Sequence, residues 1–167
     1  MKIENDILIP EIARLLAEGK EVRFTPSGVS MRPYIEGDSD SVILKQLNRP
    51  PRVGDILLAR VTVHRTPYTV HNTHTTYVLH RLIRIENDRT PYTVHRTPIT
   101  YILQGDGNLS GEERCSSGDI LGTVIRIENP QGRRKLLTRG RLWFYLRPLR
   151  KYLLKIYRHS LLKWRYN

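Results

Sequence analysis

The stretch SGVSMRP, residues 27–33, separates a strand-like VRF at residues 22–24 from an acidic turn, EGD, at residues 36–38. From VRF onward, short runs rich in β-branched, aromatic and aliphatic residues alternate with Gly, Pro, Asn and Asp. Such runs are typical of strands, which are expected at residues 22–24, 41–44, 55–63, 77–85, 100–103 and 120–127. The pattern predicts a mainly antiparallel β domain over residues 21–132, with SGVSMRP as the loop after its first strand.

Ser30 is the candidate reactive residue of this loop. A serine hydroxyl becomes a nucleophile when a neighbouring base removes its proton and nearby donors hold the oxyanion that forms. Gly28 permits a tight turn, Met31 offers an apolar anchor for a substrate, and Pro33 stiffens the chain after the serine. The alternative is an ordinary polar turn before a strand.

Length and composition indicate one domain with appendages. The chain has 167 residues, of which 39% are hydrophobic, and this is enough for one core. A single cysteine, Cys115, excludes an internal disulfide, and the chain has no metal-type cysteine pair. Neither a cofactor nor a metal is expected.

The net charge of +12 is concentrated at the C-terminal end of the chain. Residues 133–167 contain 12 of the 28 lysines and arginines and none of the 16 acidic residues. Residues 1–132 therefore carry no formal net charge, and the basic segment needs its own explanation.

The N-terminal segment, residues 1–20, is expected to contain a short amphipathic helix. Residues 7–18 place Leu8, Ile12, Leu15 and Leu16 on one side, with Pro10 in the first turn and Gly19 as the stop. No apolar run approaches the ~20 residues that span a bilayer, and the first residues lack the pattern of a signal peptide. The protein is expected in the cytoplasm.

Two segments, residues 63–76 and 87–100, interrupt the alternation of short strand-like runs and turns. Each consists of two copies of a seven-residue unit such as VHRTPYT. Proline and threonine disfavour a helix there, so both segments are interpreted as expanded hairpin loops at the two ends of the strand that carries His80. The segments also hold four of the six histidines, which raises a metal-site alternative, but no cysteine or carboxylate partner accompanies them.

Three Gly-Asp pairs stand at strand entries, at residues 37–38, 54–55 and 118–119. Each is expected to be a turn in which the glycine adopts an unusual backbone angle and the aspartate caps the turn.

Six sequence blocks occur in the order of a known superfamily. They are SGVSMRP, the first Gly-Asp pair, VGDILL at residues 53–58, LHRLI at residues 79–83, QGDGN at residues 104–108 and GDILG at residues 118–122. In this order the blocks resemble the signal peptidase and SOS-repressor self-cleavage superfamily of serine peptidases. The resemblance covers residues 21 to 127 and implies a β-rich catalytic fold with Ser30 as the nucleophile.

The resemblance also implies a base and an acid. Bacterial signal peptidases and the repressors use a lysine on a later strand, but no lysine occurs between Lys45 and Lys135. The matching position is His80, as in signal peptidases of the endoplasmic reticulum and archaea. A histidine titrates near neutrality and accepts a serine proton readily. Asp106 matches the aspartate that supports the histidine.

The resemblance also implies two further site residues, each of which departs from the family pattern. A second acid falls on Glu112, a glutamate in place of an aspartate. Ser27 is a candidate oxyanion donor, although it stands three residues before Ser30 where bacterial signal peptidases have two. The alternatives are that His80 is a half-buried strand residue and that Asp106 is only a turn residue.

The basic segment is expected to form an amphipathic helix after residues 147–148. Leu149, Tyr152, Leu153, Ile156 and Ser160 fall along one side of that helix, beside the aromatic run at residues 143–145. The cationic and aromatic residues expected to bind an anionic membrane are Trp143, Arg147, Arg150, Lys151, Lys155 and Arg158. The alternatives are a helix packed on the domain with a solvated basic face and, third, a nucleic-acid-binding segment.

These observations together predict a cytoplasmic, membrane-peripheral serine endopeptidase that cleaves a peptide bond in an exported or membrane-bound precursor. Ser30 and His80 form the expected dyad, with Asp106 as support. One alternative is an inactive peptide- or membrane-binding relic of the fold. The other is a regulator that cleaves itself or binds nucleic acid.

Overall fold

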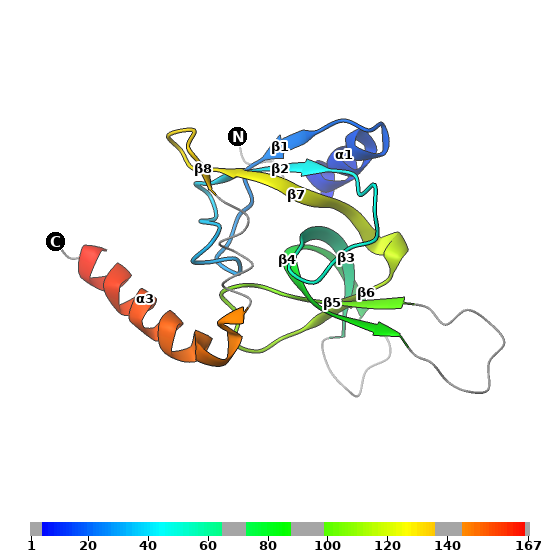
Figure 1. Cartoon of the computed structure of the whole chain (residues 1–167). Coiled ribbons are helices and arrows are strands. Elements are labelled where there is room, and N and C mark those ends of the chain that lie inside the picture. Colours follow the sequence, from blue (N-terminus) through cyan, green and yellow to red (C-terminus); the bar gives the residue numbers. More distant parts are fainter. Residues whose placement is uncertain (1–4, 65–72, 88–98, 136–144, 166–167) are drawn as a thin grey trace.

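The antiparallel β prediction is confirmed by a computed structural model, which describes residues 5–64, 73–87, 99–135 and 145–165. Eight strands form one sheet, hydrogen-bonded in the order β1-β2-β7-β3-β4-β5-β6, with β8 paired to β7 (Figure 1). The strands are β1 (Val22–Phe24), β2 (Ser41–Lys45), β3 (Ile56–His64), β4 (Thr73–Asn87), β5 (Ile99–Gln104), β6 (Glu113–Cys115), β7 (Ile120–Glu128) and β8 (Arg134–Lys135).

The sheet bends back on itself. Strands β3 and β6 contact each other although β4 and β5 lie between them in the hydrogen-bonding order. Antiparallel pairs with bulges connect the strands, including a register shift between Leu82 and Arg84 where β4 pairs with β5. Bulges bend a strand and increase its twist. The bend brings the end of β6 close to the middle of β4.

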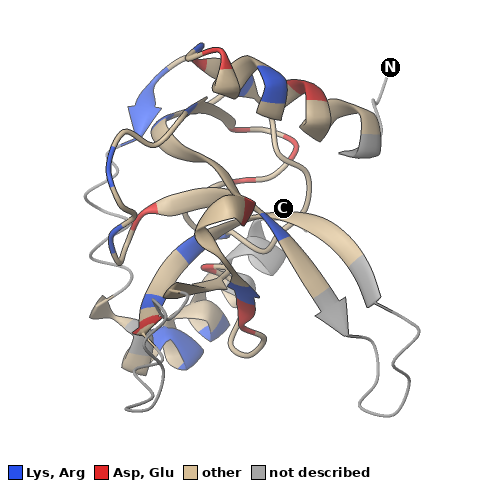
Figure 2. Ribbon diagram, turned by 90° about the vertical axis from the view of Figure 1, so that its right-hand side faces the viewer, with Lys and Arg blue, Asp and Glu red and all other residues tan. Residues whose placement is uncertain are grey.

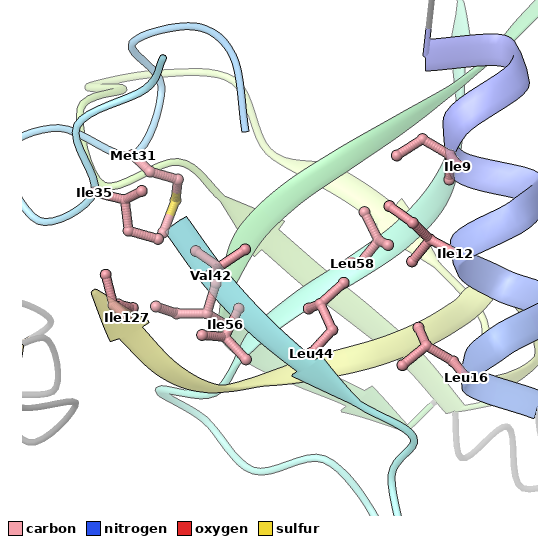
Figure 3. Packing of buried hydrophobic residues seen from close by; sticks show 11 residues of the cluster. Ile9, Ile12, Leu16, Met31, Ile35, Val42, Leu44, Ile56, Leu58 and Ile127 are labelled. Atoms are coloured by element: carbon pink, nitrogen blue, oxygen red, sulfur yellow. The ribbon is translucent and has the colours of Figure 1, made fainter. Parts of the chain in front are cut away.

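The N-terminal helix α1 (Asn5–Ala17) packs on the sheet through its apolar face. Ile9, Ile12 and Leu16 enter the main core together with Leu44 and Leu58 (Figure 3). The helix begins at least two residues earlier than expected, so Pro10 lies inside it and not in its first turn. Gly19, with φ of +78°, follows its end as predicted.

The two repeat segments were expected to be loops over their whole length, and this was wrong at their edges. Strand β4 begins at Thr73, and β3 runs on to His64, which pairs with Thr73. Threonine and valine favour extended backbone, so the ends of the repeats continue the flanking strands. The remaining repeat residues, 65–72 and 88–98, lie outside the described residues.

Only one of the three Gly-Asp pairs has the predicted geometry. Gly54 has φ of +96°, and the carboxylate of Asp55 accepts a hydrogen bond from the Arg52 amide at 2.9 Å. In the first pair the positive φ of 63° belongs to Asp38 itself. In the third pair Asp119 caps the turn, but the glycine is not among the residues with positive φ.

The basic segment divides between the sheet and a helix. Its first residues form β8, where Lys135 Nζ lies 2.5 Å from a carboxylate oxygen of Asp40. The 3₁₀ turn η2 (Arg147–Leu149) then leads into helix α3 (Arg150–Arg165), which projects from the body (Figure 1). Helix α1 carries both Glu11 and Arg14, whereas α3 contains no acidic residue (Figure 2). No helix among the described residues is long and apolar enough to cross a membrane.

Candidate functional site

Ser30 and His80, which are far apart in the sequence, line the same cavity. The cavity has a volume of about 140 Å³ and lies between the loop after β1 and strand β4. Its lining consists of Pro26, Ser27, Gly28, Ser30, Met31, Ile35, Gly37, Tyr77, Val78, Leu79 and His80. The cavity therefore combines the hydroxyls of two serines and an imidazole with several apolar side chains.

The loop that carries Ser30 is anchored by the residues that follow the serine. Met31 is buried, and its carbonyl accepts hydrogen bonds from the amides of Tyr34 and Ile35 at 3.0 and 2.9 Å. The side chains of Met31 and Ile35 pack in the main core beside Val42 (Figure 3). Packing of the next residue into the core limits the movement of Ser30.

The loop is closed by the acidic turn at residues 36–38. The Asp38 amide donates to the Pro26 carbonyl at 2.8 Å. A Cβ atom at Gly37 would collide with the carbonyl oxygen of Gly28, so the two backbone segments can cross this closely only with glycine at position 37. This crossing explains the glycine of the first Gly-Asp pair better than a backbone angle does.

His80 lies on β4 opposite Leu57 of β3 and is 5% exposed. Its Nδ1 atom lies 3.0 Å from Oε2 of Glu113, which belongs to β6. A carboxylate at Nδ1 orients an imidazole ring and stabilises its protonated form, and leaves Nε2 to exchange a proton with another group. His80 and Glu113 therefore have the relative placement of a general base and its orienting acid.

Gly105 and Gly107 lie against the backbone of Ser30, and Gly105 also lies close to the ring of His80. The amide of Gly107 donates to the Ser30 carbonyl at 2.7 Å. A Cβ atom at Gly105 would stand 2.5 Å from the Ser30 carbonyl oxygen and 3.1 Å from Nε2 of His80. Only glycine at position 105 lets the Ser30 loop and the imidazole approach residues 105–108 so closely.

Asp106 occupies a different position from the one expected. Both of its carboxylate oxygens accept hydrogen bonds from Arg81, at 2.8 and 2.6 Å, and the two side chains are almost completely buried. Arg81 also donates to the Gly54 carbonyl at 2.8 Å. The guanidinium fork matches a carboxylate in two places, so Asp106 and Arg81 form a bidentate pair. Asp106 was expected to orient His80, but the carboxylate that lies beside Nδ1 of His80 is that of Glu113.

The other candidates from the sequence are divided between the cavity and the surface. Ser27 and Met31 line the cavity, whereas Pro33 is not among its lining residues. Glu112 pairs with Arg84 at 3.0 Å on the surface, with 36% of its side chain exposed. Neighbouring residues of an extended chain point to opposite sides, so Glu112 and Glu113 cannot both face His80.

Glu113 was missed in the sequence, because the three-residue strand β6 that begins with it is too short to show an alternation. It stands two residues before Cys115, which is buried in the second core cluster. Because side chains alternate along a strand, a residue two positions from a buried one faces the same side. The apolar cavity residues Tyr77, Val78 and Leu79 precede His80 directly and were also not singled out.

One expected membrane-binding residue, Arg150, is instead buried. It is 5% exposed and donates hydrogen bonds to the loop at residues 104–108. Lys151 and Lys155 are exposed, as a surface role requires. Arg147 belongs to η2 and Arg158 to α3, while Trp143 lies outside the described residues.

Groups with three His, Cys, Asp or Glu side chains suited to hold a metal ion do not occur among the described residues. The only cysteine, Cys115, is buried, and burial together with the nearby Asp119 carboxylate raises its pKa to about 11. The thiol therefore remains protonated at neutral pH, a form in which it is a poor nucleophile.

Comparison of the chain with protein-family models, with curated proteins and with solved structures gave no match.

Proposed function

We propose that the chain is a serine endopeptidase that resembles signal peptidases, with Ser30 as nucleophile and His80 as general base. The observation that carries the proposal is the shared cavity of Ser30 and His80, with Glu113 at Nδ1 of the imidazole. The signal-peptidase type of the fold is part of the proposal. The eight-stranded antiparallel sheet and the position of Ser30 after its first strand support it.

The proposed reaction proceeds through an acyl-enzyme. Ser30 Oγ attacks the carbonyl carbon of the scissile peptide bond while Nε2 of His80 takes the serine proton. The carbon–nitrogen bond then breaks, and His80 returns the proton to the leaving amine. A water molecule then attacks the ester carbonyl and gives a proton to His80. His80 returns this proton to Ser30 Oγ as the ester bond breaks and the acid leaves. Glu113 stabilises the imidazolium formed in each half, and Ser27 is the proposed donor to the oxyanion.

The role of Asp106 in this proposal is to position the site. Through Arg81 it fixes the loop whose Gly107 amide holds the Ser30 carbonyl. Direct orientation of the imidazole is assigned to Glu113.

The proposed substrate is a peptide segment of an exported or membrane-associated precursor. The lining of the cavity includes Met31, Ile35, Val78 and Leu79 but no Asp, Glu, Lys or Arg, so an uncharged side chain beside the scissile bond fits it better than a charged one. The precursor itself is inferred from the resemblance to signal peptidases.

An anionic membrane surface is the proposed partner of helix α3. Leu149, Tyr152 and Ile156 are 53%, 65% and 67% exposed and recur at helical spacing, next to the exposed Lys151 and Lys155. Segment 133–167 has 12 basic residues and no acidic one, which complements anionic headgroups. The proposed location of the enzyme is therefore the cytoplasm, at the membrane surface.

Sedimentation with vesicles containing phosphatidylserine tests this partner. Ile156→Glu is expected to lower binding, and Ile7→Glu, at a similarly exposed isoleucine (69%) on α1, to leave it unchanged. Equal binding by all three proteins, or no binding by the native chain, would reject the membrane partner.

A serine-directed fluorophosphonate, with detection by intact mass, tests the peptidase. Labelling of Ser30 is expected in the native chain and is expected to be lost in Ser30→Ala and His80→Ala. The matched controls, Ser39→Ala and His159→Ala, replace exposed residues outside the cavity and are expected to label normally. Folded native protein that remains unlabelled from neutral to alkaline pH would favour a peptide-binding relic. Spontaneous shortening that needs Ser30 would favour a self-cleaving regulator.

A further inference from the structure

Helix α3 contacts the body through a buried arginine at its first residue. The Nη2 atom of Arg150 donates to the carbonyls of Gly105 and Asn108 at 2.8 and 2.9 Å and to that of Asp106. Its Nη1 atom donates to the side-chain oxygen of Gln104 at 3.3 Å. One guanidinium therefore binds four acceptors within residues 104–108.

The same loop is in direct contact with the proposed site. The Gly107 amide holds the Ser30 carbonyl at 2.7 Å, and Gly105 lies against both that carbonyl and Nε2 of His80. Buried backbone carbonyls need donors, and here α3, an element outside the sheet, supplies them. A guanidinium presents several donors in one rigid plane, which a lysine ammonium cannot reproduce.

We propose that Arg150 is a positioning residue of the Ser30–His80 site and that docking of α3 holds the loop at residues 104–108 in place. The inference rests on the proposed peptidase function and adds a dependence of that site on the C-terminal helix. Arg150 and Leu154 are buried on the inner face of α3, whereas Tyr152 and Ile156 are exposed. Binding of a membrane surface to Tyr152 and Ile156, on the outer face of α3, therefore leaves the contacts of Arg150 with residues 104–108 intact.

The rate of Ser30 acylation by the fluorophosphonate is the first test. Arg150→Ala is expected to slow acylation by about 10- to 100-fold, since small misplacements of reacting groups have effects of that size. Sub-denaturing guanidinium chloride is expected to restore part of the rate in this variant, and sodium chloride at equal concentration is not. His159→Ala, at an exposed position of the same helix, is the matched control and is expected to react at the native rate.

If the Arg150→Ala variant does not fold, the Arg150→Lys variant is measured in its place. It keeps a cation at the buried position but not the planar set of donors, so acylation is still expected to be slow. A native rate in Arg150→Lys or in folded Arg150→Ala would overturn the inference.

Hydrogen exchange of the Gly107 amide is a second test that needs no reaction at Ser30. Exchange is expected to be faster in Arg150→Ala than in the native chain and unchanged in His159→Ala. Leu154→Ala removes apolar packing of α3 but not the arginine, so equal exchange in Leu154→Ala and Arg150→Ala would overturn a specific role of Arg150. If the native chain is never labelled, the peptidase proposal fails, and unchanged Gly107 exchange in Arg150→Ala would reject the positioning role as well.

Discussion

Nδ1 of His80 and Oε2 of Glu113 lie 3.0 Å apart, although the two residues belong to strands that are not hydrogen-bonded neighbours. The bend of the sheet brings β6 to the imidazole on β4. Glu113 is partly buried, with 22% of its side chain exposed, so its carboxylate interacts with His80 at reduced screening by water. This pair leads to a direct test of which acid supports the histidine.

Glu113→Gln is expected to lower the rate of Ser30 acylation by about 100-fold, since loss of the carboxylate removes stabilisation of the imidazolium. The measurement is the acylation rate with the fluorophosphonate at neutral pH. Glu86→Gln, which removes a surface carboxylate paired with Arg84, is the control and is expected to react normally. A native rate in Glu113→Gln would show that an acid other than Glu113 orients His80.

Asp106→Asn is expected to reduce the free energy of unfolding by about 3–5 kcal/mol, because it leaves the buried Arg81 without its charged partner. Urea unfolding of this variant, of Arg81→Met and of the double variant measures the coupling between the two residues. The double variant is expected to be more stable than the sum of the single losses predicts. Additive losses would contradict the buried pair.

Gly105→Ala is expected to slow acylation of Ser30 by at least about 10-fold, because the added methyl group forces the Ser30 backbone or the His80 ring to shift. Gly118→Ala is the matched control, since its nearest neighbour would be the Ser116 hydroxyl at an ordinary 3.9 Å. The two variants are compared by acylation rate after each is shown to be folded. Equal rates would show that the loop yields without disturbing the site.

Asp119 gives a prediction about the dependence of stability on pH. The Ser116 hydroxyl, at 2.7 Å, and then the Ser116 amide and Arg60 hold the pKa of Asp119 below its usual value. A depressed carboxyl pKa stabilises the folded state above the pKa of the unfolded chain, and this contribution is lost as the pH falls through the folded-state pKa.

Asp119→Asn is therefore expected to lower the free energy of unfolding by about 1 kcal/mol at pH 7, a value reduced for the partial exposure of the pair. The difference between the native chain and the variant is expected to shrink as the pH falls below the ordinary aspartate pKa of about 3.9. Urea unfolding over a series of pH values measures it. A difference that stays constant with pH would contradict the assignment to this carboxylate.

Local pattern predicted most of the strands because strand formation depends on neighbouring residues. Val22–Phe24 was predicted at its exact bounds, and β2, β3, β5 and β7 within one residue at either end. Strands β6 and β8 were missed, since three or two residues are too few to show an alternation. The N-terminal helix was predicted from its apolar spacing, although Ile9 was not named as part of its buried face.

Ser30 and His80 were named from sequence, and the structure brings both to one cavity. What the acids do was not predictable, because a carboxylate takes its role from the partner that the fold provides. Arg81 binds Asp106 from the strand beside it, and the bend of the sheet brings Glu113 to His80.

The sequence by itself determined the antiparallel β class, the N-terminal helix, the loop that carries Ser30 and the basic character of the C-terminal segment. These properties depend on residue type and short-range spacing. Only the tertiary structure decided that Glu113 contacts His80, that Arg81 pairs with Asp106 and that Arg150 turns inward to residues 104–108. Each of these contacts joins segments distant in sequence, and burial selects the partner with which each charged group satisfies its hydrogen bonds.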